Sequence, residues 1–145
     1  MNTPVKFEIA KLLKEKGFDY HLLYNDFADY YDYFDKSVQG RLHVSDFPED
    51  KFPDENKWTP VPYIYQVIIW LYEKHGIWID VYYNSKYKSW DYEYTNINWS
   101  QEEVDKKLEE DIHNLLDNIF NAKIKYNSPT EAYKAAIEYT LKNLI

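Results

Sequence analysis

Four aspartates at three-residue spacing form the pattern in this sequence that is closest to a chemical site. Asp26, Asp29, Asp32 and Asp35 lie in the tyrosine-rich stretch DFADYYDYFD. Carboxylates gathered in this way are the ligands that hard cations such as Ca²⁺ and Mg²⁺ prefer. The stretch lacks the turn glycine and the closing glutamate of an EF-hand loop, however, and aromatic residues stand between its acids. We therefore assign no metal and no cofactor, and a cation site stays open as an alternative.

The same stretch is our candidate partner-binding surface. Tyrosine is enriched at protein interfaces, because its ring can pack while its polar tip stays in water. The residues that we assign to this surface are Asp26, Asp29, Tyr30, Tyr31, Asp32, Tyr33 and Asp35. The hypothesis requires the carboxylates to point outward, with no reactive centre behind them. Plain packing of the rings against the domain, with the acids in water, is the simpler alternative.

The histidines, serines and glycines give no catalytic or phosphate-binding motif. None of the four histidines forms an H-x-x-x-H or H-E-x-x-H pair, and without cysteine there is neither a thiol nucleophile nor a cysteine-based zinc site. No serine stands in a G-x-S-x-G context, and three glycines are too few for a phosphate-cradling loop. We therefore predict no catalytic residues and a protein that is not an enzyme. His75 is expected at a helix C-terminus, where the helix dipole favours a positive charge.

The charge balance argues against nucleic acid as the partner. The net charge is −8, and Arg41 is the single arginine. Binding to a duplex needs lysines and arginines that neutralise phosphates. The aromatic residues of the predicted hairpin could offer bases a stacking platform, but such platforms normally come with a basic groove. These residues are Trp78, Tyr82, Trp90, Tyr92 and Tyr94. We favour an aromatic face that a following helix covers, and we expect a host protein as the partner, while a homo-oligomer stays open.

Apolar residues at helical spacing predict three to four helices, at about 4–16, 62–75, 101–120 and 129–144. Ser100 with Glu103 and Ser128 with Glu131 match the capping box that opens a helix. Glycine follows the predicted ends of the first two helices, which suits a residue with positive φ at that position. The apolar stripe of the third helix consists of Val104, Leu108, Ile112, Leu115, Leu116 and Ile119.

Alternating residues on either side of a polar link predict a β-hairpin over about 77–95. Trp78, Asp80 and Tyr82 share one side of its first half, opposite an apolar side. The acidic, tyrosine-rich segment 19–57 is predicted to be irregular, with short strands around Tyr30–Phe34 and Arg41–Val44.

These elements and the length of 145 residues predict a single α+β domain over 1–145. We expect a small antiparallel sheet whose central hairpin packs against the 62–74 helix and the C-terminal helix, with about 100–121 as an inserted helix. No apolar run approaches the roughly 20 residues that span a bilayer. The first residues lack the apolar core of a signal peptide, and no cysteine is present for disulfides. We therefore expect a cytoplasmic protein without a membrane partner.

Three stretches of the sequence carry a resemblance to known proteins. They are KLLKEKGF at 11–18, the segment 62–81 with WLYEKHGIWIDV at its end, and SPTEAYKAAIEYTLKNLI at 128–145. The middle stretch is the distinctive one and contains a W-L-x-x-K-H-x-I-x-I helix-to-strand junction. Together the three resemble a family of small uncharacterised proteins encoded by phages and prophages of gut Bacteroidetes. The resemblance implies a phage or mobile-element origin, and it transfers no functional residues.

Our leading hypothesis from the sequence is a non-enzymatic binding protein of phage or mobile-element origin. It would engage a host protein inside a bacterium through its acidic, tyrosine-rich surface. One version is an antagonist of host defence, whose acidic face imitates nucleic-acid charge on a basic effector. Two other classes stay open: a small-ligand or nucleotide-signal binding protein with an aromatic pocket, and a small metal-dependent hydrolase.

Overall fold

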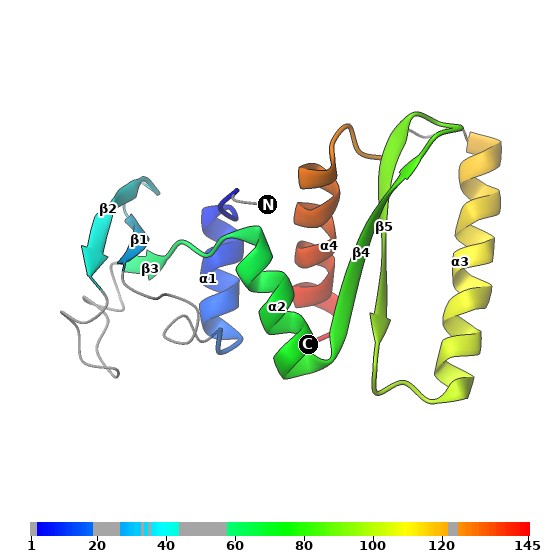
Figure 1. Cartoon of the computed structure of the whole chain (residues 1–145), viewed down its shortest axis with the longest axis horizontal. Coiled ribbons are helices and arrows are strands. Elements are labelled where there is room, and N and C mark those ends of the chain that lie inside the picture. Colours follow the sequence, from blue (N-terminus) through cyan, green and yellow to red (C-terminus); the bar gives the residue numbers. More distant parts are fainter. Residues whose placement is uncertain (1–2, 19–26, 33, 35, 44–57, 122–124) are drawn as a thin grey trace. The chain divides into compact units, whose positions relative to one another are not determined.

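The computed structural model describes residues 3–18, 27–32, 34, 36–43, 58–121 and 125–145 (Figure 1). The chain divides into two compact units, residues 1–70 with 138–145, and residues 71–137. The boundary between the units falls inside two helices, α2 (Ile64–His75) and α4 (Pro129–Asn143). Helices and antiparallel strands are both present, so the α+β class predicted from the sequence is confirmed. One domain over 1–145 stays a prediction.

In the first unit, α1 (Phe7–Glu15) buries the apolar stripe Ile9, Ala10 and Leu13. The helix begins later than the predicted residue 4, because the preceding residues are extended and pair with another segment. Val5 N–H donates to the carbonyl of Pro62 at 3.0 Å. Gly17, at φ 81°, ends the helix as predicted.

A three-stranded antiparallel sheet follows α1 in the order β2-β1-β3. The strands are β1 (Phe27–Asp32), β2 (Val38–His43) and β3 (Trp58–Pro60). The first two overlap the strands predicted within 19–57, whereas β3 was not predicted. Tyr31 of β1 lies opposite Val38 of β2 and Thr59 of β3, so β1 is the central strand.

Helix α2 is apolar on most of its surface, as its sequence predicts. Ile64, Val67 and Leu71 are almost completely buried. The side-chain oxygen of Gln66 accepts a hydrogen bond from Tyr63 N–H at 2.8 Å and so caps the first turn. His75 is the last helical residue, where the sequence predicted it.

In the second unit, Gly76 leads from α2 directly into the hairpin of β4 (Ile77–Asn84) and β5 (Ser89–Asn96). Its φ is 67°, and a Cβ at this position would lie 2.8 Å from Ile97 and Asn98, so only glycine fits without a shift. The predicted hairpin at about 77–95 is confirmed. It forms a sheet of its own, so the described residues contain two small sheets where one was predicted.

Helix α3 (Gln101–Asn121) begins with the predicted capping box. Ser100 Oγ accepts from Glu103 N–H at 3.3 Å, and the Glu103 carboxylate accepts from Ser100 N–H at 2.6 Å. At α4, Ser128 Oγ accepts from Glu131 N–H as predicted, but the Glu131 carboxylate accepts from Asn127 N–H instead of Ser128.

Within the second unit, α3 lies alongside the hairpin next to β5, and the beginning of α4 lies on the other side (Figure 1). The hairpin is also tied to Tyr126, three positions before α4, since Trp90 N–H donates to the carbonyl of Tyr126 at 2.9 Å. Among the helices of the described residues, none is long and apolar enough to cross a membrane.

Candidate functional site

Tyr31, one of the predicted partner-binding residues, packs inside the first unit. Its side chain is 8% exposed, and its hydroxyl donates to the carbonyl of Val5 at 2.6 Å. Its ring meets the ring of Phe7 edge-on, with centroids 5.8 Å apart. Burial raises the pKa of Tyr31, and the negative charge of Glu8 adds to this. The phenol therefore stays protonated and serves as an internal hydrogen-bond donor.

Asp32, also in the predicted surface, organises the turn that follows β1. Its carboxylate accepts a hydrogen bond from Phe34 N–H at 2.7 Å, and its carbonyl accepts from Lys36 N–H at 2.8 Å. Asp32 is half-buried, while Phe34 at the tip of the turn is almost completely exposed. Lys36 reaches back to α1, where its amine lies 3.1 Å from the carboxylate of Glu8.

The other members of the predicted surface lie outside the described part of the chain. This holds for Asp26, Tyr33 and Asp35, and for the side chains of Asp29 and Tyr30. The strip as a recognition surface and the cation site in the same stretch therefore stay predictions. Among the described residues, no three His, Asp or Glu side chains come together as a metal site would need.

A second acidic and aromatic surface lies on the hairpin, on the side that carries the even-numbered residues of β4. Three cross-strand pairs build it, because residues directly opposite in an antiparallel pair point to the same side. We call this surface the acidic aromatic face, and its residues are Trp78 with Thr95, Asp80 with Glu93, and Tyr82 with Asp91. Trp78 is 49% exposed and Tyr82 41%. The sequence-based interpretation that a following helix covers these rings is thus wrong for both.

Two carboxylates face each other in the middle of this face. Asp80 of β4 lies directly opposite Glu93 of β5, and both are exposed. Side chains in such a pair have their Cβ atoms about 5 Å apart, and like charges at this position destabilise a sheet. Between the exposed rings of Trp78 and Tyr82, the hairpin therefore carries a charge pair that opposes its own folding.

The negative potential at this face also acts on Tyr82. Partial burial raises the pKa of Tyr82 to about 12, together with the negative charges of Asp91, Glu93 and Asp111 and a hydrogen bond with Asp91. The phenol therefore keeps its proton at physiological pH and stays a hydrogen-bond donor. A positive charge brought to this face would meet the opposite, favourable potential.

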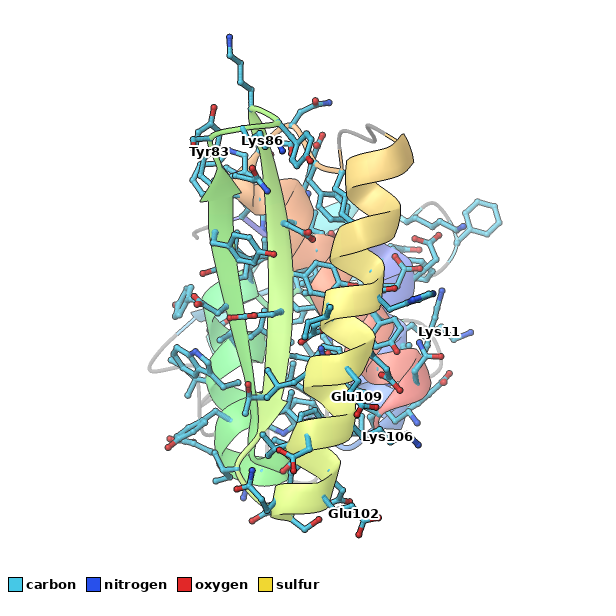
Figure 2. The ribbon with its side chains drawn as sticks, turned by 90° about the vertical axis from the view of Figure 1, so that its right-hand side faces the viewer. Lys11, Tyr83, Lys86, Glu102, Lys106 and Glu109 are labelled. Atoms are coloured by element: carbon cyan, nitrogen blue, oxygen red, sulfur yellow. The ribbon has the colours of Figure 1, made fainter. Side chains whose placement is uncertain are left out.

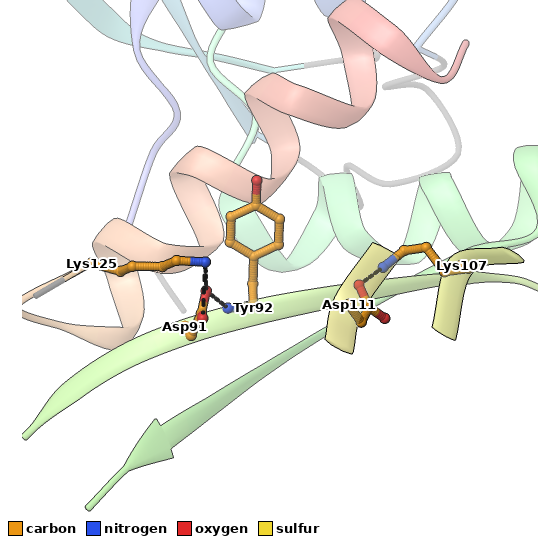
Figure 3. A network of polar contacts seen from close by, with 5 residues as sticks. All are labelled: Asp91, Tyr92, Lys107, Asp111 and Lys125. Carbon is orange, nitrogen blue, oxygen red and sulfur yellow. Dashed lines mark hydrogen bonds and ion pairs between the residues drawn. The ribbon is translucent and has the colours of Figure 1, made fainter. Parts of the chain in front are cut away.

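Two of the described lysines near the acidic aromatic face, Lys125 and Lys107, are already engaged. Lys125 reaches Asp91 with its amine 3.1 Å from the carboxylate, and Asp91 also accepts from the N–H of Tyr92 at 2.8 Å (Figure 3). On α3, Lys107 pairs with Asp111 (Figure 3), and its amine lies 4.6 Å from the centre of the Tyr94 ring. Asp80 and Glu93 remain as the exposed charges between the two rings.

The opposite side of the hairpin is buried in the protein at the end that follows α2, where Ile77 and Ile79 are almost inaccessible to solvent. Towards the turn, the rings of Tyr83 and Trp90 pack against each other with centroids 5.3 Å apart. Figure 2 shows Tyr83 and Lys86 at the turn end of the hairpin, so the two ends of β4 differ in their surroundings.

No family model matches the sequence, and neither a curated protein nor a solved structure is significantly similar to it. The resemblance to phage and prophage proteins stays an expectation from the sequence. The site is therefore interpreted from its own residues.

Proposed function

We propose that this protein is a non-enzymatic binding protein that engages a basic protein partner through the acidic aromatic face. The observation that supports the proposal is the exposed pair Asp80 and Glu93 between the half-exposed rings of Trp78 and Tyr82. A sheet has no structural reason to place like charges opposite each other. A partner that brings arginine or lysine to the pair would remove the repulsion, so the arrangement is favourable only in a complex.

Arginine is the side chain that suits this face best. Its planar guanidinium can pair with a carboxylate and stack on an aromatic ring at the same time. Ring and carboxylate alternate along β4, where Trp78, Asp80 and Tyr82 follow one another at two-residue spacing on the same side of the strand. Tryptophan, tyrosine and arginine are also the residues that contribute most to the energy of protein interfaces.

The resemblance to phage and prophage proteins suggests where the partner comes from, and we include this in the proposal. The partner would be a host protein inside a bacterial cell, and the binding protein an antagonist of host defence. Its exposed rings and carboxylates would take the place of bases and phosphates on a basic effector. A nucleic acid itself is a poor ligand, because its phosphates would be repelled by Asp80 and Glu93.

A labelled arginine-rich peptide tests the proposal directly. Fluorescence anisotropy should give saturable binding to the wild-type protein that weakens as salt is added, whereas a glutamate-rich peptide of equal length should not bind. Replacing both rings, Trp78→Ala with Tyr82→Ala, should weaken the affinity about tenfold, since it removes two interface aromatics.

Tyr65→Ala is the matched control, because Tyr65 is a tyrosine of similar exposure on α2. This variant should bind the peptide as the wild type does. Absence of saturable binding to the wild-type protein would overturn the proposal. Equal losses in the control and in the hairpin variant would overturn it as well, because binding would then not depend on the acidic aromatic face.

A further inference from the structure

Helix α3 exposes apolar side chains and covers a charged one. Val104, Leu108 and Ile112 follow one another at four-residue spacing, which places them along one side of the helix. Leu108 is 54% exposed and Ile112 60%. The side chain of Lys107 is instead 14% exposed, and its amine lies over the ring of Tyr94. A surface helix normally has the reverse arrangement, with its apolar stripe against the protein.

The exposed stripe has an acidic border. Each residue of a helix is turned by about 100° from the one before it, so Asp105 and Glu109 lie next to Val104 and Leu108 on the outward flank. Glu109 projects from α3 in Figure 2. The sequence of α3 contains seven acidic residues and two lysines.

The two lysines of α3 lie outside this border. Lys107 is engaged by Asp111 on the covered side of α3. Lys106 is about 60° around the helix from Glu109 and about 160° from Leu108, so it lies beside Glu109 on the side away from the stripe. Asp105 and Glu109 are therefore the charged residues next to the stripe on its outward flank.

From this arrangement we propose that α3 binds an amphipathic helix of the partner protein, whose apolar side is bordered by lysine or arginine. The stripe of Val104, Leu108 and Ile112 would be buried against the apolar side of that helix, and Asp105 and Glu109 would pair with its basic border. Recognition of this kind uses apolar anchors at i, i+3 or i+4 and i+7. The inference rests on the proposed function in that the occupant is taken to be a segment of the same basic partner.

A second copy of this chain is the occupant that the charges disfavour. In an antiparallel pair of α3 helices, Asp105 and Glu109 of one copy would lie beside the same residues of the other. Like charges at neighbouring helical positions destabilise the pair, and Lys107 is already engaged by Asp111. Opposite charge is therefore needed in the occupant.

A set of designed peptides of about 15 residues tests the inference, since this length is near the minimum for a helix in water. The first has leucine along one helical side and lysine at its borders. The second has the same composition in scrambled order, and the third replaces lysine by glutamate. Titration against the full-length protein should show the first peptide binding about tenfold more tightly than the scrambled one, and the third not binding.

Variants on α3 and on the hairpin separate this inference from the proposed function. Leu108→Gln with Ile112→Gln should weaken the first peptide about tenfold and leave the arginine-rich peptide unaffected. Trp78→Ala with Tyr82→Ala should do the reverse. Glutamine is a good helix former and both positions are exposed, so circular dichroism should show the α3 variant folded.

The outcomes are distinct for the two proposals. The inference about α3 would be overturned, and the hairpin proposal left unaffected, by either of two results. One is that the α3 variant binds the first peptide as tightly as the wild type does. The other is that the wild type binds the scrambled peptide as tightly as the first peptide. If instead the wild type binds the first peptide but not the arginine-rich peptide, the hairpin proposal is overturned and the inference about α3 is supported. Light scattering that shows a dimer of the free protein, dissolved by the α3 substitutions, would identify a second copy as the occupant and overturn the inference.

Discussion

Two amphipathic helices of this protein use the same sequence pattern to different ends. In α1, Ile9 and Leu13 are repeated at helical spacing and are buried, with Leu13 completely inaccessible. In α3, Leu108 and Ile112 are repeated at the same spacing and are more than half exposed. Periodicity therefore predicts that a helix has an apolar side, but it does not predict whether this chain or another molecule covers that side.

The largest expected difference between the two helices is in stability. Leu13→Ala should lower the free energy of unfolding by about 2–5 kcal/mol, because it leaves a cavity in a packed core. Leu108→Ala should change it by no more than about 0.5 kcal/mol, because the side chain is largely in water and alanine suits a helix.

Urea denaturation followed by circular dichroism measures both values. The comparison fails if the two substitutions cost the same, since Leu108 would then be packed within the folded protein. A large loss for Leu108→Ala would also contradict the proposed exposure of the α3 stripe.

Two tyrosines extend the contrast from leucines to polar aromatics. Tyr31→Phe removes the hydroxyl that donates to the carbonyl of Val5 and should cost about 1 kcal/mol of stability. Tyr82→Phe should cost less than this, because Tyr82 is 41% exposed whereas Tyr31 is buried. Chemical denaturation of the two variants side by side provides the measurement. A smaller loss for Tyr31→Phe than for Tyr82→Phe would reverse the assignment of packing and surface roles.

The raised pKa of Tyr82 makes the stability of the protein depend on pH in the alkaline range. A tyrosine in the unfolded chain loses its proton near pH 10, whereas Tyr82 in the folded protein holds it to about pH 12. Between these values the folded state binds more protons than the unfolded state, so this residue makes stability fall as pH rises from 10 towards 12.

Ultraviolet absorbance of phenolate follows this titration. A phenol with a midpoint close to 12 should be present in the wild-type protein and missing in Tyr82→Phe. If the phenol that is lost in Tyr82→Phe has its midpoint near pH 10 instead, then neither the partial burial of Tyr82 nor the nearby carboxylates raise its pKa as the structure indicates.

Much of the fold could be predicted because its signals are local. The capping box of Ser100 and Glu103, the alternation along β4 and the glycine after α2 each involve neighbouring residues, and each is found in the structure. The start of α1 was missed because Val5 pairs with Pro62, which is distant in the sequence. Strand β3 was missed for the same reason, since three residues ending in proline become a strand only beside β1.

The candidate site was harder to predict than the fold. Alternation places Trp78, Asp80 and Tyr82 on one side of the hairpin, but their exposure depends on how α3 lies beside β5. The inward direction of Tyr31 depends on Val5, whose carbonyl accepts its hydrogen bond. Tyr31 was assigned to the partner-binding surface because aspartates surround it in the sequence. In the structure it contacts Phe7 of α1 and Val5, which precedes that helix.

By our proposal, the acidic aromatic face lowers the stability of the free protein and favours binding of a basic partner. Urea denaturation of the wild type and of Glu93→Gln, each with and without the arginine-rich peptide, tests it most directly. Without peptide, Glu93→Gln should be more stable than the wild type by about 0.2–1 kcal/mol, because the repulsion between Asp80 and residue 93 is removed. With peptide, the wild type should gain more stability than Glu93→Gln, since tighter binding to the folded state raises stability further. A Glu93→Gln protein that is less stable alone, or that gains as much from the peptide, would contradict the claim.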